Sequence, residues 1–476
     1  MATRDPRIEQ LRTGLLPIVR IEGEEVRYRM EDRLAAYGCP AVGVAVMDGG
    51  ALAWSEGFGR LHKGGDQPAD ADTMFAGASI SKPVTAALAL QLVERGVFDL
   101  DTDVNTYLKS WKIPENEFTR QSPVTLRWLL SHKAGTTVHG FGGVGPGSID
   151  DVVTTQPTVV DMLEGRVPGR MSGAVRVDKV PGGTVRYSGG GTMIVQLMLE
   201  EATGKPFAEL AEENIFAPLG MTRTTFRYPL PDRFRANAAW GHDTEGDTIP
   251  EKWTVTPESA AGGIYTTAGD YARFMLACRD AWLGKPGSIL GREIATEMMT
   301  PQGGEFGLGW IIVGEGKQKR FTHGGSCEGY QCETSCYLED GKGAVVLTNA
   351  VSGLQFYWEV LNAIADMYQW NGFMPAPKKI VPIPRSDFDR YAGTYEIVSG
   401  VDAPFFRIWE EGGVLRSEIK GMRGGPRDVL MDQNGYFFNR VGPYETHIIY
   451  DADGLASELV VYLSGTTEIM RARRAS

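Results

Sequence analysis

The sequence has few of the features that would assign it to a specialised class of protein. Its five cysteines are few for 476 residues and odd in number, which argues against a disulfide framework and fits a reducing compartment. Its longest apolar stretch, residues 84–93, is about half as long as a membrane-spanning helix must be. Residues 1–6 contain no apolar segment of the kind found in secretory signals. We therefore expect a cytoplasmic protein with no membrane span.

Positive charge is also scarce. The chain has 48 lysines and arginines against 60 aspartates and glutamates, which gives a formal net charge of −12. Nucleic-acid binding needs net or locally clustered positive charge, so we expect no nucleic-acid partner. The length allows two or three domains, and the composition is that of an ordinary soluble protein. Glycine is abundant, at 60 residues, many of them in pairs and triples, which predicts tight turns and close backbone approaches.

Hydrophobic periodicity predicts strands near both ends of about the first 370 residues and short helices between them. Residues 42–47 and 52–58 flank the turn Asp48-Gly49-Gly50, which predicts a hairpin. Further β-like runs lie at 307–313, 334–338 and 344–348, and the helical patterns lie at 5–37, 79–95 and 353–369. We therefore predict an α/β (α+β) fold: one antiparallel sheet flanked by helices, with an all-helical lobe inserted at about residues 100–255.

A proline-rich linker is predicted at residues 373–386, where four prolines fall within a short stretch. Beyond it, short β-like runs are separated by glycine and Asp-Gly turns over about 90 residues, which is typical of a small β-barrel. The prediction therefore has a first domain over residues 1–372, the linker, and a C-terminal β-barrel domain over residues 387–476.

The first candidate for chemistry is Ser79-Ile80-Ser81-Lys82, at the start of the helix predicted over 79–95. Residues three apart share a helix face, so the Ser79 hydroxyl and the Lys82 amine can meet. A helix N-terminus adds free backbone N–H groups and positive potential. Such a serine can act as a nucleophile whose proton passes to a neutral lysine. The alternative is a helix-capping serine beside a surface lysine, because this short pattern is common by chance.

Two glycine-rich segments supply further candidates. Tyr187 starts a Tyr-Ser-Gly-Gly-Gly run before a predicted helix, and its hydroxyl is suited to relaying protons. His323 starts the run His323-Gly324-Gly325-Ser326 ahead of the late strands. The two glycines allow a ligand to lie against a strand, and the histidine adds a hydrogen-bond donor. The alternatives are a half-buried aromatic beside a flexible turn and a histidine in a glycine-rich turn.

Other patterns predict no cofactor. A G-x-G-x-x-G match at residues 140–145 lacks the preceding strand and following helix of a dinucleotide site, so we interpret it as a loop. Cys327, Cys332 and Cys336 lack the paired spacing of a metal site. We therefore predict neither a metal nor an organic cofactor. For His132 and His139 we favour buried structural roles, although both are close enough in sequence to reach a cleft.

The order and spacing of the three candidate motifs resemble those of the serine β-lactamase and penicillin-binding superfamily. Other stretches are similar to its class C-like branch, which includes D,D-peptidases, D-aminopeptidases and esterases: 125–135, 217–221, 261–267 and 306–310. The resemblance covers roughly residues 25–370. The tail from Phe388 onward is similar to the lipocalin-like barrels that are appended to some members.

The resemblance implies a role for each candidate. Ser79 is the acylated nucleophile, and Lys82 and Tyr187 share general acid–base work. His323 takes the place of the lysine in a Lys-Thr-Gly motif. The backbone N–H groups of Ser79 and Ser326 form the oxyanion hole, in which one donor typically contributes about 10²–10³ in rate. Gly189 stands where the family has an asparagine that grips a substrate amide.

The two departures from the family pattern, at Gly189 and His323, shift the expected substrate. Neutral histidine offers less fixed charge for a substrate carboxylate than lysine does. We therefore expect acyl transfer on peptide or amide bonds of a small-molecule or peptide substrate, with D-residues included through the resemblance. A carboxylesterase, a peptide cyclase or transpeptidase, and a catalytically inactive binding module remain alternatives. The sequence gives no prediction of the oligomeric state.

Overall fold

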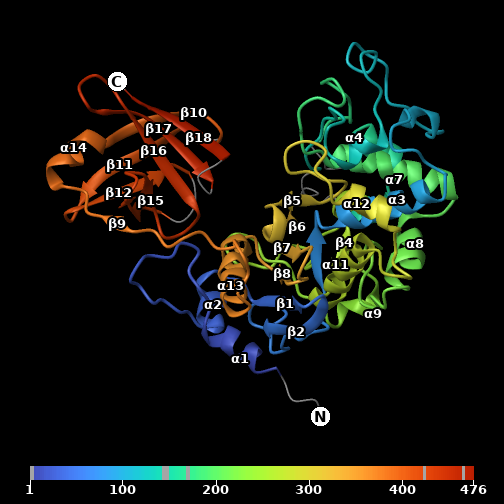
Figure 1. The fold of residues 1–476 in the computed structure, drawn as a ribbon, viewed down its shortest axis with the longest axis horizontal. Helices are drawn as coiled ribbons and strands as arrows, with labels where there is room; N and C mark the ends of the chain where they lie inside the picture. Colours follow the sequence, from blue (N-terminus) through green and yellow to red (C-terminus); the bar gives the residue numbers. More distant parts are fainter. Residues whose placement is uncertain are drawn as a thin grey trace. The chain divides into compact units, whose positions relative to one another are not determined.

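The structure is a computed structural model and describes residues 5–141, 149–167, 172–401, 403–421, 425–463 and 467–475 (Figure 1). The chain divides into two compact units. The first comprises Met1–Thr13 and Arg29–Gly372, and the second comprises Gly14–Tyr28 and Phe373–Ser476. Among the described residues, no helix has the length and apolar character that crossing a membrane requires.

A six-stranded antiparallel sheet forms the centre of the first unit, with strand order β2-β1-β8-β7-β6-β5. Its strands come from both ends of the unit, as the sequence pattern predicts, and Val44 in β1 pairs with Val346 in β8. Gly49 and Gly50 make the turn between β1 and β2, where their positive φ angles of 56° and 78° favour glycine. The strands are β1 (Ala41–Asp48), β2 (Ala51–Gly59), β5 (Ile311–Val313), β6 (Arg320–Cys327), β7 (Tyr330–Tyr337) and β8 (Gly343–Thr348).

Helices cover this sheet. α13 (Gly353–Met367) packs on β7 and β8, and α11 (Ala268–Leu283) packs on β1, β2 and β8 (Figure 1). The prediction of a single helix over residues 5–37 is wrong, because the structure has two short helices, α1 (Pro6–Thr13) and α2 (Met30–Ala36). Gly14 and Pro17 follow α1 directly, and both residue types disfavour a continuing helix.

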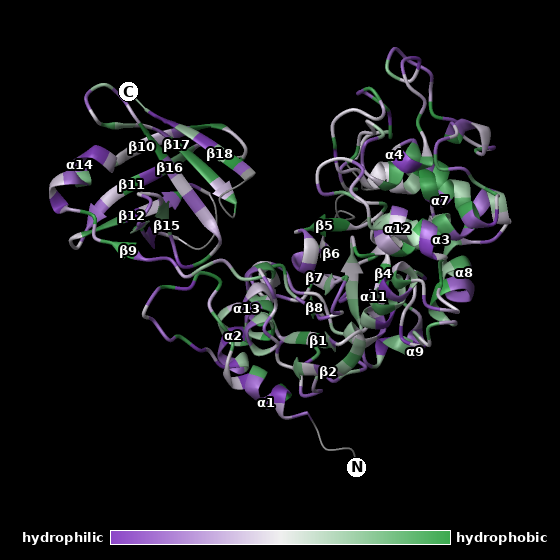
Figure 2. Cartoon of the chain, in the orientation of Figure 1, coloured by the Kyte–Doolittle hydropathy of each residue, from purple (hydrophilic) through white to green (hydrophobic). Residues whose placement is uncertain are grey.

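The helical lobe is built around α3 and α7, which pack against each other and against α10. α3 is buried on all sides from Ser81 to Leu92, so it is a core helix with no exposed face. α7 is buried from Gly189 to Leu199 and is largely hydrophobic (Figure 2). The described residues between 100 and 255 form helices and loops with no named strand.

The other elements of the first unit are short, and a two-stranded sheet of β3 and β4 leads the chain into α3. They are β3 (Phe75–Ala78), α3 (Ser81–Glu94), η1 (Val104–Thr106), α4 (Leu126–Leu130), α5 (Ile149–Thr155), α6 (Val159–Leu163), α7 (Gly189–Thr203), α8 (Phe207–Ala211), η2 (Glu212–Phe216), α9 (Asp232–Arg235), α10 (Ser259–Gly262), β4 (Ile264–Thr266), α12 (Arg292–Met298) and η3 (Gly316–Gln318).

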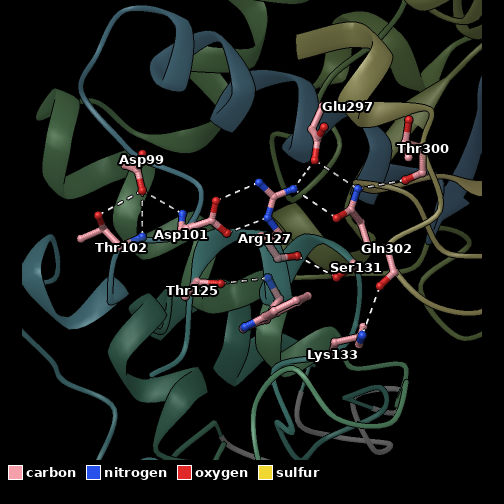
Figure 3. A network of polar contacts seen from close by, with 11 residues as sticks. Asp99, Asp101, Thr102, Thr125, Arg127, Ser131, Lys133, Glu297, Thr300 and Gln302 are labelled. Atoms are coloured by element: carbon pink, nitrogen blue, oxygen red, sulfur yellow. Dashed lines mark hydrogen bonds and ion pairs between the residues drawn. The ribbon is translucent and has the colours of Figure 1, made fainter. Parts of the chain in front are cut away.

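A polar network anchors α4 to α12 (Figure 3). The Arg127 guanidinium donates to both carboxylate oxygens of Asp101, at 2.6 and 2.9 Å, and also binds Glu297. It reaches the side chain of Gln302 at 3.1 Å, and the backbone carbonyl of Gln302 accepts a hydrogen bond from Lys133 at 3.1 Å. These contacts therefore hold residues 125–135 in place through their polar side chains. The chain runs on from this stretch to the site described below.

The second unit contains a ten-stranded antiparallel sheet with strand order β13-β12-β11-β10-β18-β17-β16-β15-β14-β9. Its core includes Tyr395, Leu415, Leu459 and Ala472. Among the described residues no pairing joins β13 to β9, so the sheet is a curled half-barrel and not the closed barrel that the sequence predicts. The Gly14–Tyr28 segment belongs to this unit, with Glu22 donating its N–H to the Lys378 carbonyl at 2.9 Å.

The elements of the second unit are β9 (Ile380–Val381), η4 (Arg385–Asp387), α14 (Phe388–Tyr391), β10 (Gly393–Ser399), β11 (Phe405–Glu411), β12 (Val414–Ile419), β13 (Arg427–Asp428), β14 (Leu430–Asp432), β15 (Phe437–Phe438), β16 (Tyr444–Tyr450), β17 (Ala456–Leu463) and β18 (Thr467–Arg474).

Candidate active site

Ser79 lies at the junction between β3 and α3. β3 ends at Ala78, whose φ angle of 47° turns the chain from the strand toward the helix. The helix itself begins at Ser81, two residues later than the sequence predicts, and the Lys82 N–H donates to the Ser79 carbonyl at 3.0 Å. Ser79 is half-buried and sits just ahead of the free N–H groups of the helix.

Lys82 extends from the first turn of α3 toward Ser79. Its Nζ lies 3.0 Å from Ser79 Oγ and donates to the carbonyl of Ala261 in α10 at 2.6 Å. The side chain is buried, and among the described residues no carboxylate forms an ion pair with it. The amine is therefore fixed between a hydroxyl and a carbonyl, and it is oriented to exchange a proton with Ser79.

Tyr187 comes to the same place from the loop before α7. Its ring centre is 4.9 Å from Lys82 Nζ and 6.2 Å from the ring of His323. The rings of His132 and His139 lie 4.4 and 5.0 Å from it. The Tyr187 ring thus lies between the lysine amine and three histidine rings.

His132 is more closely tied to the site than the sequence indicates. It has a φ angle of 58°, and its Nδ1 accepts a hydrogen bond from the Ser188 N–H at 3.2 Å. Burial, followed by the charge of Lys82, holds the pKa of His132 well below its ordinary value, so the ring is neutral. It therefore packs as a neutral ring against Tyr187. The only feature of the sequence that could indicate this role for His132 is its place at the end of a helix and before a glycine turn.

His323 lies in β6 and is 3% exposed. Its Nδ1 lies 2.7 Å from the Gly324 carbonyl oxygen and donates to it, because a carbonyl oxygen can only accept. Burial and the charge of Lys82 lower the pKa of the ring to about 3, so the ring is neutral. This tautomer leaves Nε2 as an acceptor. Nε2 is buried, and among the described residues it has no hydrogen-bond partner.

Gly324, Gly325 and Ser326 continue β6 past the nucleophile. A Cβ on Gly325 would lie 2.1 Å from the carbonyl oxygen of Gly77, two residues before Ser79, so β6 and β3 approach each other at a distance that only glycine allows. β5 pairs with β6 only from Arg320 to Thr322, which leaves the edge of the following residues open toward the cavity. Ser326 Oγ accepts a hydrogen bond from Gln331 at 2.8 Å.

A cavity of about 690 Å³ brings all the predicted site residues together. Its lining includes Ser79, Lys82, Tyr187, His323, Gly324, Gly325 and Ser326. His139, Glu258 and Glu328 also line it, and the sequence patterns assign no role in the site to these two glutamates. The two residues whose backbone N–H groups are the predicted oxyanion donors, Ser79 and Ser326, therefore line the same cavity.

The structure gives a steric reason for Gly189. A Cβ there would lie 3.2 Å from the His139 carbonyl oxygen and 3.5 Å from the Phe141 ring. The Gly189 N–H donates to the same His139 carbonyl at 2.9 Å. A side chain at this position would therefore be in tight contact with the 139–141 segment, which would have to move by a few tenths of an ångström to admit it. Residues 142–145 of the loop predicted at 140–145 lie outside the described residues.

The buried neutral ring of His323 predicts that acid destabilises the fold. The unfolded chain binds a proton at this ring near its ordinary pKa of 6.5, whereas the folded protein does so only near a pKa of about 3. Between these values the unfolded state holds more protons, so the free energy of unfolding falls as the pH falls, by about 1.4 kcal/mol per pH unit for this group. We expect His323→Gln to flatten the slope by about half of that amount near pH 6.5 and by nearly all of it near pH 5, measured as urea unfolding at several pH values from 7 to about 5.

The other histidines are present in both proteins, so the difference between the slopes reports mainly on His323, with a smaller part from its effect on the pKa of His132. Equal slopes for the wild type and His323→Gln would contradict a neutral buried ring.

The comparisons of this chain with known proteins all point to the same family. The model of the family described as Beta-lactamase matches residues 26–365. Penicillin-binding protein 4* of Bacillus subtilis (strain 168) is 25% identical over 448 residues, which cover 89% of this chain and 93% of that protein. Two solved structures share the fold. The octameric penicillin-binding protein homologue from Pyrococcus abyssi has a TM-score of 0.60 at 20% identity and covers 93% of this chain and 98% of its own. The D-amino acid amidase from Ochrobactrum anthropi SV3 has a TM-score of 0.55 at 22% identity, with coverage of 71% and 96%.

Proposed function

The chain belongs to the beta-lactamase family, and from this membership we propose that it is a serine hydrolase or acyl transferase that forms an acyl-enzyme on Ser79. The observation that carries the proposal is the 3.0 Å hydrogen bond between Lys82 Nζ and Ser79 Oγ inside the cavity. A surface lysine beside a capping serine, the alternative for this motif, requires an exposed amine, and Lys82 is buried. This arrangement also favours an enzyme over an inactive binding module.

The proposed reaction has two halves. In the first, the proton of Ser79 passes to the pair of Lys82 and Tyr187, and Oγ bonds to the substrate carbonyl carbon. The N–H groups of Ser79 and Ser326 stabilise the oxyanion, and the bond to the leaving group breaks as Lys82 and Tyr187 return a proton to it. In the second half, water gives a proton to the same pair and attacks the ester carbonyl carbon. The bond from this carbon to Oγ then breaks as the pair returns the proton to Ser79, and the acid product leaves.

We propose peptide or amide bonds as the substrates, including those of D-amino acids. An amide needs a proton on its leaving nitrogen, and Lys82 and Tyr187 are the two groups that can supply it. The Lys82 amine lies 4.9 Å from the centre of the Tyr187 ring. The named activity of the Ochrobactrum anthropi amidase, on D-amino acid amides, supports this class. A carboxylesterase uses the same first half with less help to the leaving group, and a cyclase replaces water with an amine of the substrate.

Covalent labelling tests the nucleophile. We expect a fluorophosphonate to add one adduct to the wild type, detected by intact mass, and none to Ser79→Ala. Ser288→Ala, at a turn where the hydroxyl bonds to a backbone carbonyl, is the matched control and is expected to be labelled like the wild type. A folded wild type that never forms an adduct would favour the binding module.

Turnover then separates the substrate classes. We expect release of ammonia from D-alaninamide, measured beside hydrolysis of p-nitrophenyl acetate. Turnover of the ester alone would favour a carboxylesterase, and cyclic products from a linear peptide with a free amine would favour a cyclase.

A further inference from the structure

The two ends of the active-site cavity differ in charge. At one end the charge of Lys82 lowers the pKa of both His132 and His323, so these three groups lie together. At the other end lies Cys327, the last residue of β6, whose pKa is raised to about 12 by burial and by the charges of Glu328 and Glu258. From His323 to Cys327 the strand advances about 13 Å, at about 3.3 Å per residue.

Glu258 is tied to the catalytic lysine through the backbone. It immediately precedes α10, and its carbonyl accepts the Ala261 N–H at 3.1 Å, while the Ala261 carbonyl holds Lys82. Its side chain is 7% exposed and lines the cavity. Glu328 follows β6, is exposed and lines the same cavity. Two carboxylates from separate segments therefore border one end of the cavity that holds Ser79.

Other described residues that line the cavity also favour a ligand that carries a hydrogen-bond donor. His323 Nε2 is an acceptor that is buried without a partner among the described residues. Lys82 is the one lysine or arginine among the described residues that line the cavity, and it is engaged with Ser79 and the Ala261 carbonyl. A substrate carboxylate would thus find no unengaged lysine or arginine there, whereas an ammonium group would find two carboxylates.

The direction of the reaction decides which part of the substrate meets the carboxylates. Lys82 and Tyr187 must protonate the leaving group, so the leaving group lies at their end of the cavity. The acyl part then extends the other way, along the open edge of β6 toward Cys327 and Glu328.

We propose that the cavity binds a positively charged nitrogen on the acyl side of the scissile bond, with Glu258 and Glu328 as its counter-ions. The inference rests on the proposed function, because Ser79 defines the acyl side. An ammonium group can be the free amino terminus of the substrate or the side chain of its acyl residue, and both present the same chemistry to the site.

Matched amides test the proposal. D-alaninamide carries an α-ammonium, Nα-acetyl-D-lysinamide carries only a side-chain ammonium, and N-acetyl-D-alaninamide carries neither. We expect the wild type to favour at least one of the cationic amides over the neutral one by about tenfold or more in kcat/KM, and the favoured amide identifies the source of the charge.

Removing each carboxyl charge tests the residues. Glu258→Gln and Glu328→Gln are expected to lower kcat/KM for the favoured cationic amide by about 10- to 100-fold, mainly through KM, and to lower it for the neutral amide much less, so that the preference for the cationic amide is lost. Because Glu328 is exposed, its variant keeps the test valid if the buried one fails to fold. Glu293→Gln, an exposed acid at the start of α12 and outside the cavity lining, makes the same charge change as a control and is expected to match the wild type.

Fluorophosphonate labelling separates the two hypotheses. Each amide is also tested as a competitor that slows labelling of Ser79, so the comparison does not depend on turnover. Wild type that is labelled at Ser79 but treats the three amides alike, or glutamine variants that weaken neutral and cationic amides equally, would overturn the ammonium site and leave the acyl-enzyme standing. Wild type that is never labelled would instead overturn the proposed function.

Discussion

Replacing Lys82 with methionine will leave the protein folded and slow acylation of Ser79 by about 10³- to 10⁵-fold, because the serine hydroxyl loses the group that takes its proton. Methionine keeps an unbranched side chain of similar length in a buried position, so the packing of α3 changes little. The Ala261 carbonyl loses one hydrogen bond, at a cost of about 1 kcal/mol. The rate of fluorophosphonate labelling measures the first effect and thermal unfolding measures the second.

Lys133→Met is the matched control for this experiment. Lys133 also donates to a backbone carbonyl, that of Gln302 at 3.1 Å (Figure 3), and it packs over the ring of Trp128. It does not line the cavity. We expect its variant to be labelled at the rate of the wild type. Equal labelling rates for Lys82→Met and Lys133→Met would remove the lysine from the proposed mechanism.

The parts of the site that the sequence predicts are those that depend on local geometry. Ser79 and Lys82 lie three residues apart, and a helical turn brings such residues to one face even though the helix begins two residues later than predicted. The first hairpin of the central sheet is equally local in origin, because alternating apolar runs around Asp48-Gly49-Gly50 specify it. The pairing of β1 with β8 is not local, and the sequence predicts it only because the buried late strands need partners.

The remaining neighbours come from segments that carry no local signal. The Ala261 carbonyl that holds Lys82 is 179 residues away along the chain, and the Ser188 N–H that bonds to His132 is 56 residues away. Glu258 likewise reaches the cavity only through the placement of α10. A carboxylate in a loop has no pattern that distinguishes it from any exposed acid until the fold buries it.

The errors in the predicted fold have similar causes. Apolar spacing over residues 5–37 fits a helix, but a segment that pairs with a distant part of the backbone can show the same spacing. Glu22 lies in such a segment, and its N–H donates to the Lys378 carbonyl. In the second unit, strand patterns predict strands correctly but do not decide whether the first and last strands pair, so a half-barrel and a closed barrel look alike. The likeness of this unit to lipocalins stays a prediction.

Gly325 offers the second large expected effect. A Cβ there would come within 2.1 Å of the Gly77 carbonyl oxygen and 2.6 Å of Cys332 Sγ, so Gly325→Ala must push β6 away from β3. Both contacts lie in the buried core, where overpacking typically costs about 1–3 kcal/mol. Because Gly77 is two residues before Ser79, the same shift moves the nucleophile relative to the Ser326 N–H. A displacement of about 1 Å can lower a rate by about 10²-fold, and we expect a loss of at least that size in the labelling rate.

The adjacent glycine provides the control, because the two side-chain positions face opposite sides of the same strand. A Cβ on Gly324 would approach Glu333 Oε2 at 2.8 Å, and a carboxylate at the end of a flexible side chain can move aside where a strand backbone cannot. We therefore expect Gly324→Ala to lower the labelling rate only a few-fold, and the melting temperature of Gly325→Ala to fall well below that of Gly324→Ala. If both variants lose activity equally, the tight contact between β6 and β3 does not set the position of Ser79. If neither does, the strand has room that the backbone contacts do not show, and the spacing of the oxyanion donors must be controlled from elsewhere in the cavity.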